Sequence, residues 1–190
     1  MIIVTFYTPA YEGIFYKHLY RSVCDLHSKE VKLYSKRVDK QLSWEKSTCL
    51  KPRVILSYLE TFKKDLWWTD SDSEVKECMN VNLPETACVG FHNLSHRKYY
   101  KKRKELLEPL TGTLFFKYSK DSIAFLAYWI RMTEICDVDG EAFALTIEKY
   151  PDMAHEIPFR YCFIPRKGFE AEEKKAACVH FQASRNRKVN

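Results

Sequence analysis

Two carboxylates stand two positions apart in Asp70-Ser71-Asp72, directly after the apolar run 66–69. Such a pair can converge on one hard divalent cation while a diphosphate supplies further oxygen ligands. The same spacing recurs at Asp137 and Asp139, so the pattern alone identifies no site. Open α/β sheets bind ligands beyond the carboxyl ends of their strands, and the first pair follows a predicted strand whereas the second follows a predicted helix. We therefore favour the first pair as metal ligands, the alternative being a solvated turn.

A histidine near the end of the chain is a further candidate ligand. His180 lies within the segment 178–185, at the end of the last predicted strand. An imidazole nitrogen added to carboxylate oxygens shifts metal preference from Mg²⁺ toward Mn²⁺. An isolated histidine is more often a hydrogen-bonded structural residue, so these residues by themselves leave both interpretations open.

Composition narrows the class of protein. The 190 residues, 46% hydrophobic and 29% charged, predict one globular domain spanning residues 1–190 rather than a disordered chain. Seven cysteines without zinc-site spacing indicate a reducing compartment, and no apolar run approaches the roughly 20 residues that cross a bilayer, so the predicted location is cytoplasmic. The net charge of +6 favours an anionic partner, and the basic run 95–104 with its two tyrosines offers either a nucleic-acid contact or a solvated surface.

The elements that must position these residues alternate along the chain. The run 1–7 reads as a buried strand closed by Pro9, and a helical apolar spacing from Tyr11 leads to a second strand at 31–36. This strand–helix–strand order predicts a parallel sheet and an α/β fold. The remaining predicted strands are 66–69, 87–91, 112–116, 157–163 and 176–181, and the remaining predicted helices are one opening at Lys51-Pro52, 120–133 and 141–150.

In this order, seven segments resemble the small GT-A glycosyltransferases, which transfer a sugar from a nucleotide diphosphate and carry an Asp-x-Asp metal motif. The segments are Thr5–Tyr11, Lys51–Leu56, Leu66–Asp72, Leu110–Phe116, Trp129, Asp139–Leu145 and Val179–Arg185. They cover nearly the whole chain. The resemblance implies a GT-A-like, Rossmann-type three-layer sandwich with a mostly parallel central sheet.

The resemblance also assigns roles to individual residues. Asp70, Asp72 and His180 would hold Mn²⁺ or Mg²⁺. The donor would be bound by Thr8, Pro9, Ala10, Tyr11, Lys51, Asp70, Ser71, Asp72, Thr111, Gly112, Thr113 and Arg185. Within that set, Thr8 to Tyr11 would cradle the base and ribose, Lys51 would approach the diphosphate, and Gly112 would let the donor sugar approach the backbone. Lys51, Asp139 and Glu141 are the candidate catalytic residues.

The implied activity is metal-assisted transfer from a UDP-sugar, or a GDP-sugar, to a hydroxyl of a glycan, protein or small-molecule acceptor. The cation and Lys51 would neutralise the charge that develops on the β-phosphate. A histidine ligand near the C-terminus favours retention by analogy, whereas inversion would need Asp139 or Glu141 as a base. Two alternatives stay open, namely a nucleic-acid-binding module that uses residues 95–104 and a catalytically inactive relative.

Overall fold

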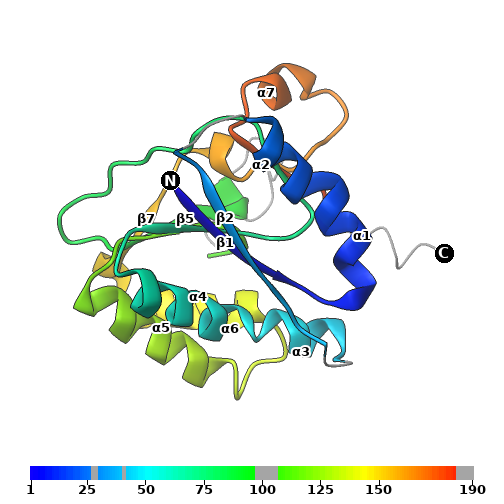
Figure 1. The fold of residues 1–190 in the computed structure, drawn as a ribbon. Coiled ribbons are helices and arrows are strands. Elements are labelled where there is room, and N and C mark those ends of the chain that lie inside the picture. Colours follow the sequence, from blue (N-terminus) through cyan, green and yellow to red (C-terminus); the bar gives the residue numbers. More distant parts are fainter. Residues whose placement is uncertain (27–29, 40–41, 97–106, 183–190) are drawn as a thin grey trace.

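The computed structural model describes residues 1–26, 30–39, 42–96 and 107–182. A six-stranded sheet in the order β2-β1-β3-β6-β5-β7 forms its centre (Figure 1). The strands are β1 (Ile2–Tyr7), β2 (Lys32–Arg37), β3 (Leu66–Thr69), β5 (Val89–Asn93), β6 (Pro109–Phe116) and β7 (Ala154–Glu156). Pairing is antiparallel only on the two sides of β6, so the other five strands share one direction. The predicted α/β class with a mostly parallel sheet is confirmed.

The first strand and its crossover form the predicted strand–helix–strand unit. Ile3 and Val4 of β1 are fully buried, because β1 lies between two neighbours and beneath helices. The chain then passes through a 3-10 turn (Pro9–Tyr11), α1 (Glu12–Phe15), a π-helical turn (Tyr16–Tyr20) and α2 (Arg21–Asp25) into β2. Pairing of Ile2 with Lys32 opens the parallel β1–β2 register.

Three helices cover one face of the sheet, namely α4 (Lys51–Phe62), α5 (Lys120–Met132) and α6 (Asp139–Lys149) (Figure 1). Pro52 lies in the first turn of α4, where its missing N–H costs nothing. Ser119 caps α5 by accepting a 3.0 Å hydrogen bond from the Ser122 backbone N–H. The helices bury a core that includes Trp68, Trp129 and Phe143.

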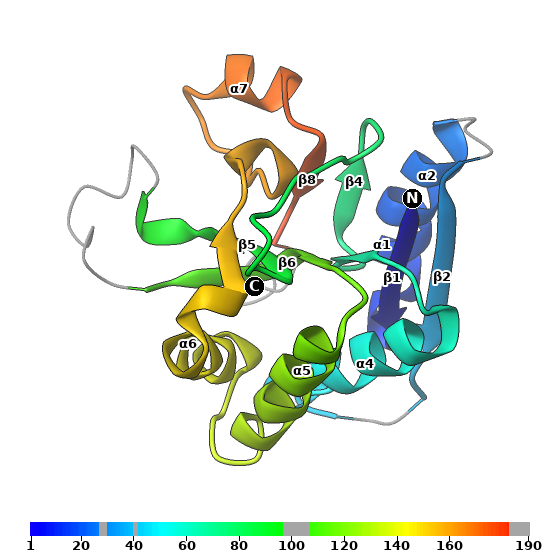
Figure 2. The ribbon, with the colours of Figure 1, turned by 90° about the vertical axis from the view of Figure 1, so that its left-hand side faces the viewer.

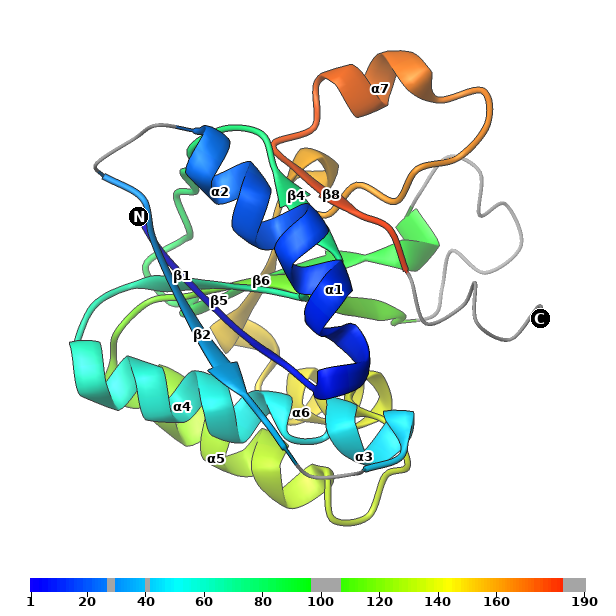
Figure 3. The same cartoon turned by 45° about the vertical axis from the view of Figure 1, so that its right-hand side comes forward.

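The opposite face is covered by the α1–α2 crossover and by a second, two-stranded sheet (Figures 2 and 3). In that sheet β4 (Ser73–Val75) pairs antiparallel with β8 (Cys178–His180). A second apolar cluster, including Phe15, Trp67 and Tyr161, fills this side. The molecule thus has the three layers expected of a Rossmann-type sandwich.

The structure differs from the sequence-based prediction at three places. The predicted strand 157–163 is wrong: β7 ends at Glu156, and the chain turns into a 3-10 helix (Phe159–Tyr161) after Pro158, which has no N–H to continue a ladder. The short elements α3 (Trp44–Thr48) and β4 carry no periodicity long enough to be recognised. The predicted strand 176–181 exists as β8 but joins the small sheet rather than the central one.

The remaining described elements are short. They are the 3-10 turns Leu94–His96 and Pro151–Met153 and the helix α7 (Glu170–Lys174). None of the helices in the described residues has the length and apolar character needed to span a membrane.

Candidate active site

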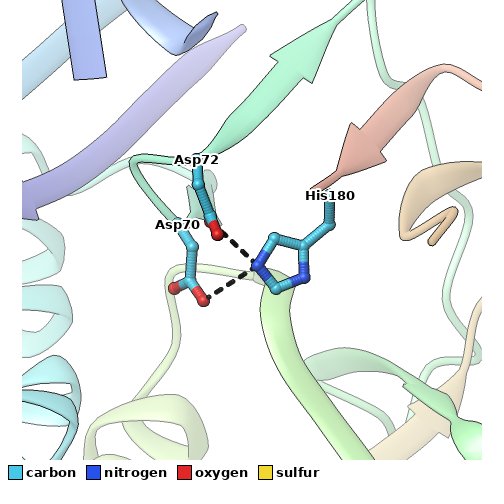
Figure 4. Close-up of side chains that lie close together, drawn as sticks. All are labelled: Asp70, Asp72 and His180. Carbon is cyan, nitrogen blue, oxygen red and sulfur yellow. Dashed lines mark ion pairs between the residues drawn. The ribbon is translucent and has the colours of Figure 1, made fainter. Parts of the chain in front are cut away.

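Asp70, Asp72 and His180 meet at the carboxyl end of β3 (Figure 4). The His180 Nε2 atom lies 2.9 Å from Asp72 Oδ1 and 3.4 Å from Asp70 Oδ2. The two carboxylates flank the turn between β3 and β4, whereas the histidine is the last residue of β8. The register of the small sheet brings the two parts together, because Ser73 pairs with His180.

Backbone hydrogen bonds fix this turn from both sides. The Asp70 N–H donates to the Gly112 carbonyl of β6 over 2.8 Å, and the Phe181 N–H donates to the Asp72 carbonyl over 3.1 Å. The turn is therefore attached to the central sheet and to the C-terminal strand at once. Such anchoring holds the three side chains in place before any ligand arrives.

The donor set fits a divalent cation. One ligand atom from each of the three residues lies within 4.8 Å of the others, giving two carboxylate oxygens and one imidazole nitrogen. Asp72 and His180 are nearly buried, whereas the Asp70 side chain keeps 26% of its surface exposed. A mixed oxygen and nitrogen set of this kind can hold a divalent cation, and the exposed side of Asp70 leaves the cluster open to a ligand on that side.

The site is charged without a metal. Burial lowers the pKa of His180, but the Asp72 and Asp70 carboxylates and hydrogen bonding outweigh this effect and raise the pKa well above its ordinary value. Burial raises the pKa of Asp70, with Asp72 and Asp139 acting in the same direction and Lys51 and His180 against it. The Nε2 atom of His180 faces both carboxylates, so a proton on it balances part of their negative charge.

Lys51 is a buried ammonium group that connects two carboxylates. Its Nζ atom lies 3.0 Å from Asp70 Oδ1 and 2.8 Å from Asp139 Oδ2, and it contacts the Thr111 carbonyl at 3.0 Å and the Thr111 hydroxyl at 3.1 Å. Burial lowers the pKa of Lys51, but the Asp139 and Asp70 carboxylates outweigh burial and raise it. Lys51 is thus charged, and its three N–H groups already face four acceptors.

The two acidic residues of α6 differ in their surroundings. Asp139 begins the helix, is 5% exposed and directs its carboxylate at Lys51. Its backbone carbonyl also accepts a 3.1 Å hydrogen bond from the buried Trp129 indole N–H. Glu141 occupies an exposed position in the first turn. Of the two predicted acids, the structure joins only Asp139 to the cluster.

Gly112 creates the space that His180 fills. A Cβ atom at residue 112 would lie 2.5 Å from His180 Nδ1 and 2.6 Å from Cε1, far closer than normal contacts. We predicted that this glycine lets a donor sugar approach the backbone. The structure shows that the imidazole ring of His180 takes that space.

We expect Gly112→Ala to displace the imidazole from Asp72, to lower the unfolding free energy by about 1–3 kcal/mol and to weaken Mn²⁺ binding. Urea unfolding and a Mn²⁺ titration would measure these effects. Gly13→Ala is the matched control, because a Cβ atom there meets nothing within 4 Å. Equal stability and equal Mn²⁺ affinity in the two variants would contradict this assignment.

The other predicted donor-binding residues that the structure describes lie at the same edge of the sheet. Thr8 to Tyr11 follow the carboxyl end of β1, which is parallel to β3, and Tyr11 packs on the second apolar cluster. Ser71 lies in the turn between the two aspartates, and Thr113 is buried with its hydroxyl 3.5 Å from Cys178 Sγ. Arg185 and residues 97–104 of the basic run lie outside the described residues.

Sequence reasoning missed the contribution of Trp68. Its indole N–H donates a 2.9 Å hydrogen bond to Asp70 Oδ1, and the Lys51 ammonium lies 5.6 Å from the ring centroid. The signal was available, because a residue two positions before Asp70 on a strand shares its face. The role of Thr111 as a double acceptor for Lys51 had no such signal, since it depends on the register between β3 and β6.

Comparison with known proteins supports the fold assignment. No protein-family model matches the chain, and no curated protein matches it. A glycosyltransferase involved in the glycosylation of the major capsid of PBCV-1 is similar over 98% of this chain and 97% of its own, with a TM-score of 0.70 and 16% identity. Mouse xyloside xylosyltransferase 1 matches over 97% of this chain and 99% of its own, with a TM-score of 0.54 and 11% identity.

A third structure, the bifunctional glycosyltransferase WbbM, matches over 96% of this chain with a TM-score of 0.62 and 12% identity. This chain spans only 45% of WbbM. At these identities the similarity concerns the path of the backbone. The chain therefore has the fold of the GT-A glycosyltransferases.

Proposed function

We propose that this chain is a metal-dependent glycosyltransferase that moves a sugar from a UDP-sugar, or less favourably a GDP-sugar, to an acceptor hydroxyl. The observation that carries the proposal is the convergence of Asp70, Asp72 and His180 at the carboxyl edge of the sheet. This is the edge at which open α/β sheets bind ligands, and the cluster suits a cation between protein and diphosphate. We further propose that residues 1–190 form one catalytic domain.

In this proposal Asp70, Asp72 and His180 hold Mn²⁺ or Mg²⁺, which would supply positive charge beside the leaving diphosphate. Thr8 to Tyr11 bind the base and ribose, with the Tyr11 ring available for stacking. Of Thr111 to Thr113, Thr111 is partly exposed at the strand edge and is where the donor sugar would rest, since His180 covers Gly112 and Thr113 is buried. Arg185 is proposed to approach the phosphates from the C-terminal segment.

The proposed role of Lys51 changes with the structure. Its ammonium faces four protein acceptors, so it stabilises the charges of Asp70 and Asp139 and fixes their positions, instead of reaching out as an unoccupied phosphate ligand. The positive charge still lies next to a metal ligand and contributes to the field at the diphosphate. Lys51 is thus a positioning residue in this proposal.

We propose retention as the stereochemical outcome. The Asp139 carboxylate is buried and lies 2.8 Å from the Lys51 ammonium, so it is already engaged inside the protein and is poorly placed to reach an acceptor hydroxyl as a base. A retaining reaction needs no such base, since the departing phosphate can take the proton. Glu141 is the remaining candidate base if the reaction inverts.

The test is thermal stability with UDP or GDP, each with and without Mn²⁺. A ligand at about 100 times its dissociation constant adds about 2.7 kcal/mol to the unfolding free energy. We expect Asp72→Asn to abolish the metal-dependent part of this stabilisation, because it replaces one of the two proposed carboxylate ligands with a neutral amide. Asp152→Asn, at an exposed turn, is the control and should retain the full metal-dependent stabilisation.

An unchanged metal-dependent shift in the Asp72→Asn variant would contradict the assigned site. Stabilisation without any sugar transfer or donor hydrolysis would instead identify an inactive relative. The nucleic-acid alternative depends on residues 97–104, which lie outside the described residues, and it receives no support from the described contacts. A cytoplasmic location stays a prediction from the cysteine content.

A further inference from the structure

A second polar cluster lies at the same edge of the sheet, on the far side of β6 from Asp70. It consists of His92 and Asn93 at the end of β5, His96 in the following 3-10 turn, and Glu156 at the end of β7. Because β5 and β7 run in the direction of β3, their carboxyl ends lie at the same edge of the sheet as the Asp70 turn. None of these four residues takes part in the proposed metal or donor site.

A chain of hydrogen bonds fixes the carboxylate of Glu156. The Asn93 side-chain oxygen accepts from the Ser95 and Glu108 backbone N–H groups, which orients its amide group toward His96 Nε2, 3.4 Å away. With that orientation, His96 Nδ1 carries the proton and donates to Glu156 Oε2 over 2.6 Å. The tautomer follows from this network.

The second oxygen of Glu156 is held less tightly. Glu156 Oε1 lies 3.4 Å from the Asn93 backbone nitrogen and 3.5 Å from His92 Nδ1, both long contacts. The Glu156 side chain keeps 32% of its surface exposed, and that of His96 keeps 51%. A carboxylate has about four acceptor positions, so a fixed, partly exposed Glu156 has capacity for hydroxyl donors from a ligand. The partly exposed Phe159 ring lies 5.2 Å from the ring of His92, whose Nδ1 atom is the one near Glu156 Oε1, and so adds an apolar surface to the cluster.

We propose that Glu156, His96 and the Phe159 ring form an acceptor subsite for a neutral, hydroxyl-rich group, that is, an uncharged sugar. A carboxylate at its centre repels phosphate or carboxylate groups and accepts from sugar hydroxyls, and the ring packs against the apolar face of a pyranose. Strands spaced about 4.8 Å apart put roughly 14 Å between β3 and β7, so an acceptor that reaches both places is an oligosaccharide. Calling this subsite an acceptor subsite rests on the proposed function. The binding test described next does not depend on that function.

The experiment is saturation-transfer NMR of the full chain with neutral trisaccharides (maltotriose, cellotriose and mannotriose), and with 3′-sialyllactose as an anionic comparison of similar size. We expect at least one neutral trisaccharide to give a signal and sialyllactose to give a weaker one. In Glu156→Gln and in His96→Gln the affinity should fall roughly tenfold or more, because a charged acceptor or its orienting partner is lost. Glu148→Gln, exposed on α6, is the matched control and should bind like the original chain.

Three outcomes would overturn the inference: no signal from any neutral trisaccharide, equal binding in Glu156→Gln and Glu148→Gln, or preferred binding of the sialylated sugar. Each variant is accepted only with a cooperative melting transition, and His96→Gln changes an exposed side chain in case Glu156→Gln fails to fold. Failure of the proposed function looks different, because it would show as no Mn²⁺-dependent stabilisation by UDP or GDP while the trisaccharide signal persists.

Discussion

Replacing Lys51 by methionine is expected to lower the unfolding free energy by about 3–5 kcal/mol, which is the usual cost of removing one partner from a buried ion pair. The ammonium is buried and lies within 3.0 Å of both the Asp70 and Asp139 carboxylates. Without it, two negative charges face each other in a site that already contains Asp72. Urea denaturation of the metal-free protein would measure the loss.

Lys46→Met is the control for this change. Lys46 is exposed on α3, only five positions away, and its replacement should alter stability by less than about 0.5 kcal/mol. Adding Asp139→Asn to the Lys51→Met variant should restore part of the loss, because one of the uncompensated charges disappears. Equal stability of the Lys51→Met and Lys46→Met variants would show that the ion pairs contribute nothing.

The second expected result concerns pH. The raised pKa of His180 in the folded protein means that its contribution to stability is complete below the unfolded value of about 6.5 and is lost as the pH rises through the folded value. The metal-free protein should therefore lose stability on the alkaline side of pH 6.5. In the proposed metal site the same proton competes with Mn²⁺, so the affinity for the metal should rise about tenfold per pH unit until the imidazole is neutral.

Urea unfolding with a chelator present, and Mn²⁺ titrations at several pH values, would test both statements. His180→Gln should remove the loss of stability above pH 6.5 that we attribute to this residue. His155→Gln, at an exposed position of β7, should still show that loss. A pH profile that is identical in the two variants would assign the titration to another group. A Mn²⁺ affinity independent of pH would remove His180 from the ligand set.

Sequence periodicity predicted the elements that have enough residues to show a period. The strand at 1–7, the helix opening at Lys51-Pro52 and the helix 120–133 all exist with small shifts of their ends. Strand β4 has three residues and no periodicity, so its pairing with β8 could not be foreseen. Pro158 was a readable signal against the predicted strand 157–163, since proline cannot donate to a ladder.

The candidate site was predictable in its residue types but not in its internal contacts. The order of segments pointed to Asp70, Asp72 and His180 as a group, and their side chains do meet. Their function as metal ligands stays a prediction. The four contacts of Lys51 and the packing of His180 on Gly112 depend on how strands and helices align in space. Pair distances of this kind are set by tertiary packing, which one sequence does not encode in any local pattern.

The pairing of β4 with β8 has a consequence for how the molecule matures. The aspartate turn belongs to the first half of the chain, and its imidazole partner arrives only with the last described strand. Contacts between such distant residues require a large loop to close, so they form late in folding. All six strands of the central sheet precede β8 in the chain, so a growing chain can present the whole sheet while Asp70 and Asp72 still lack their imidazole neighbour.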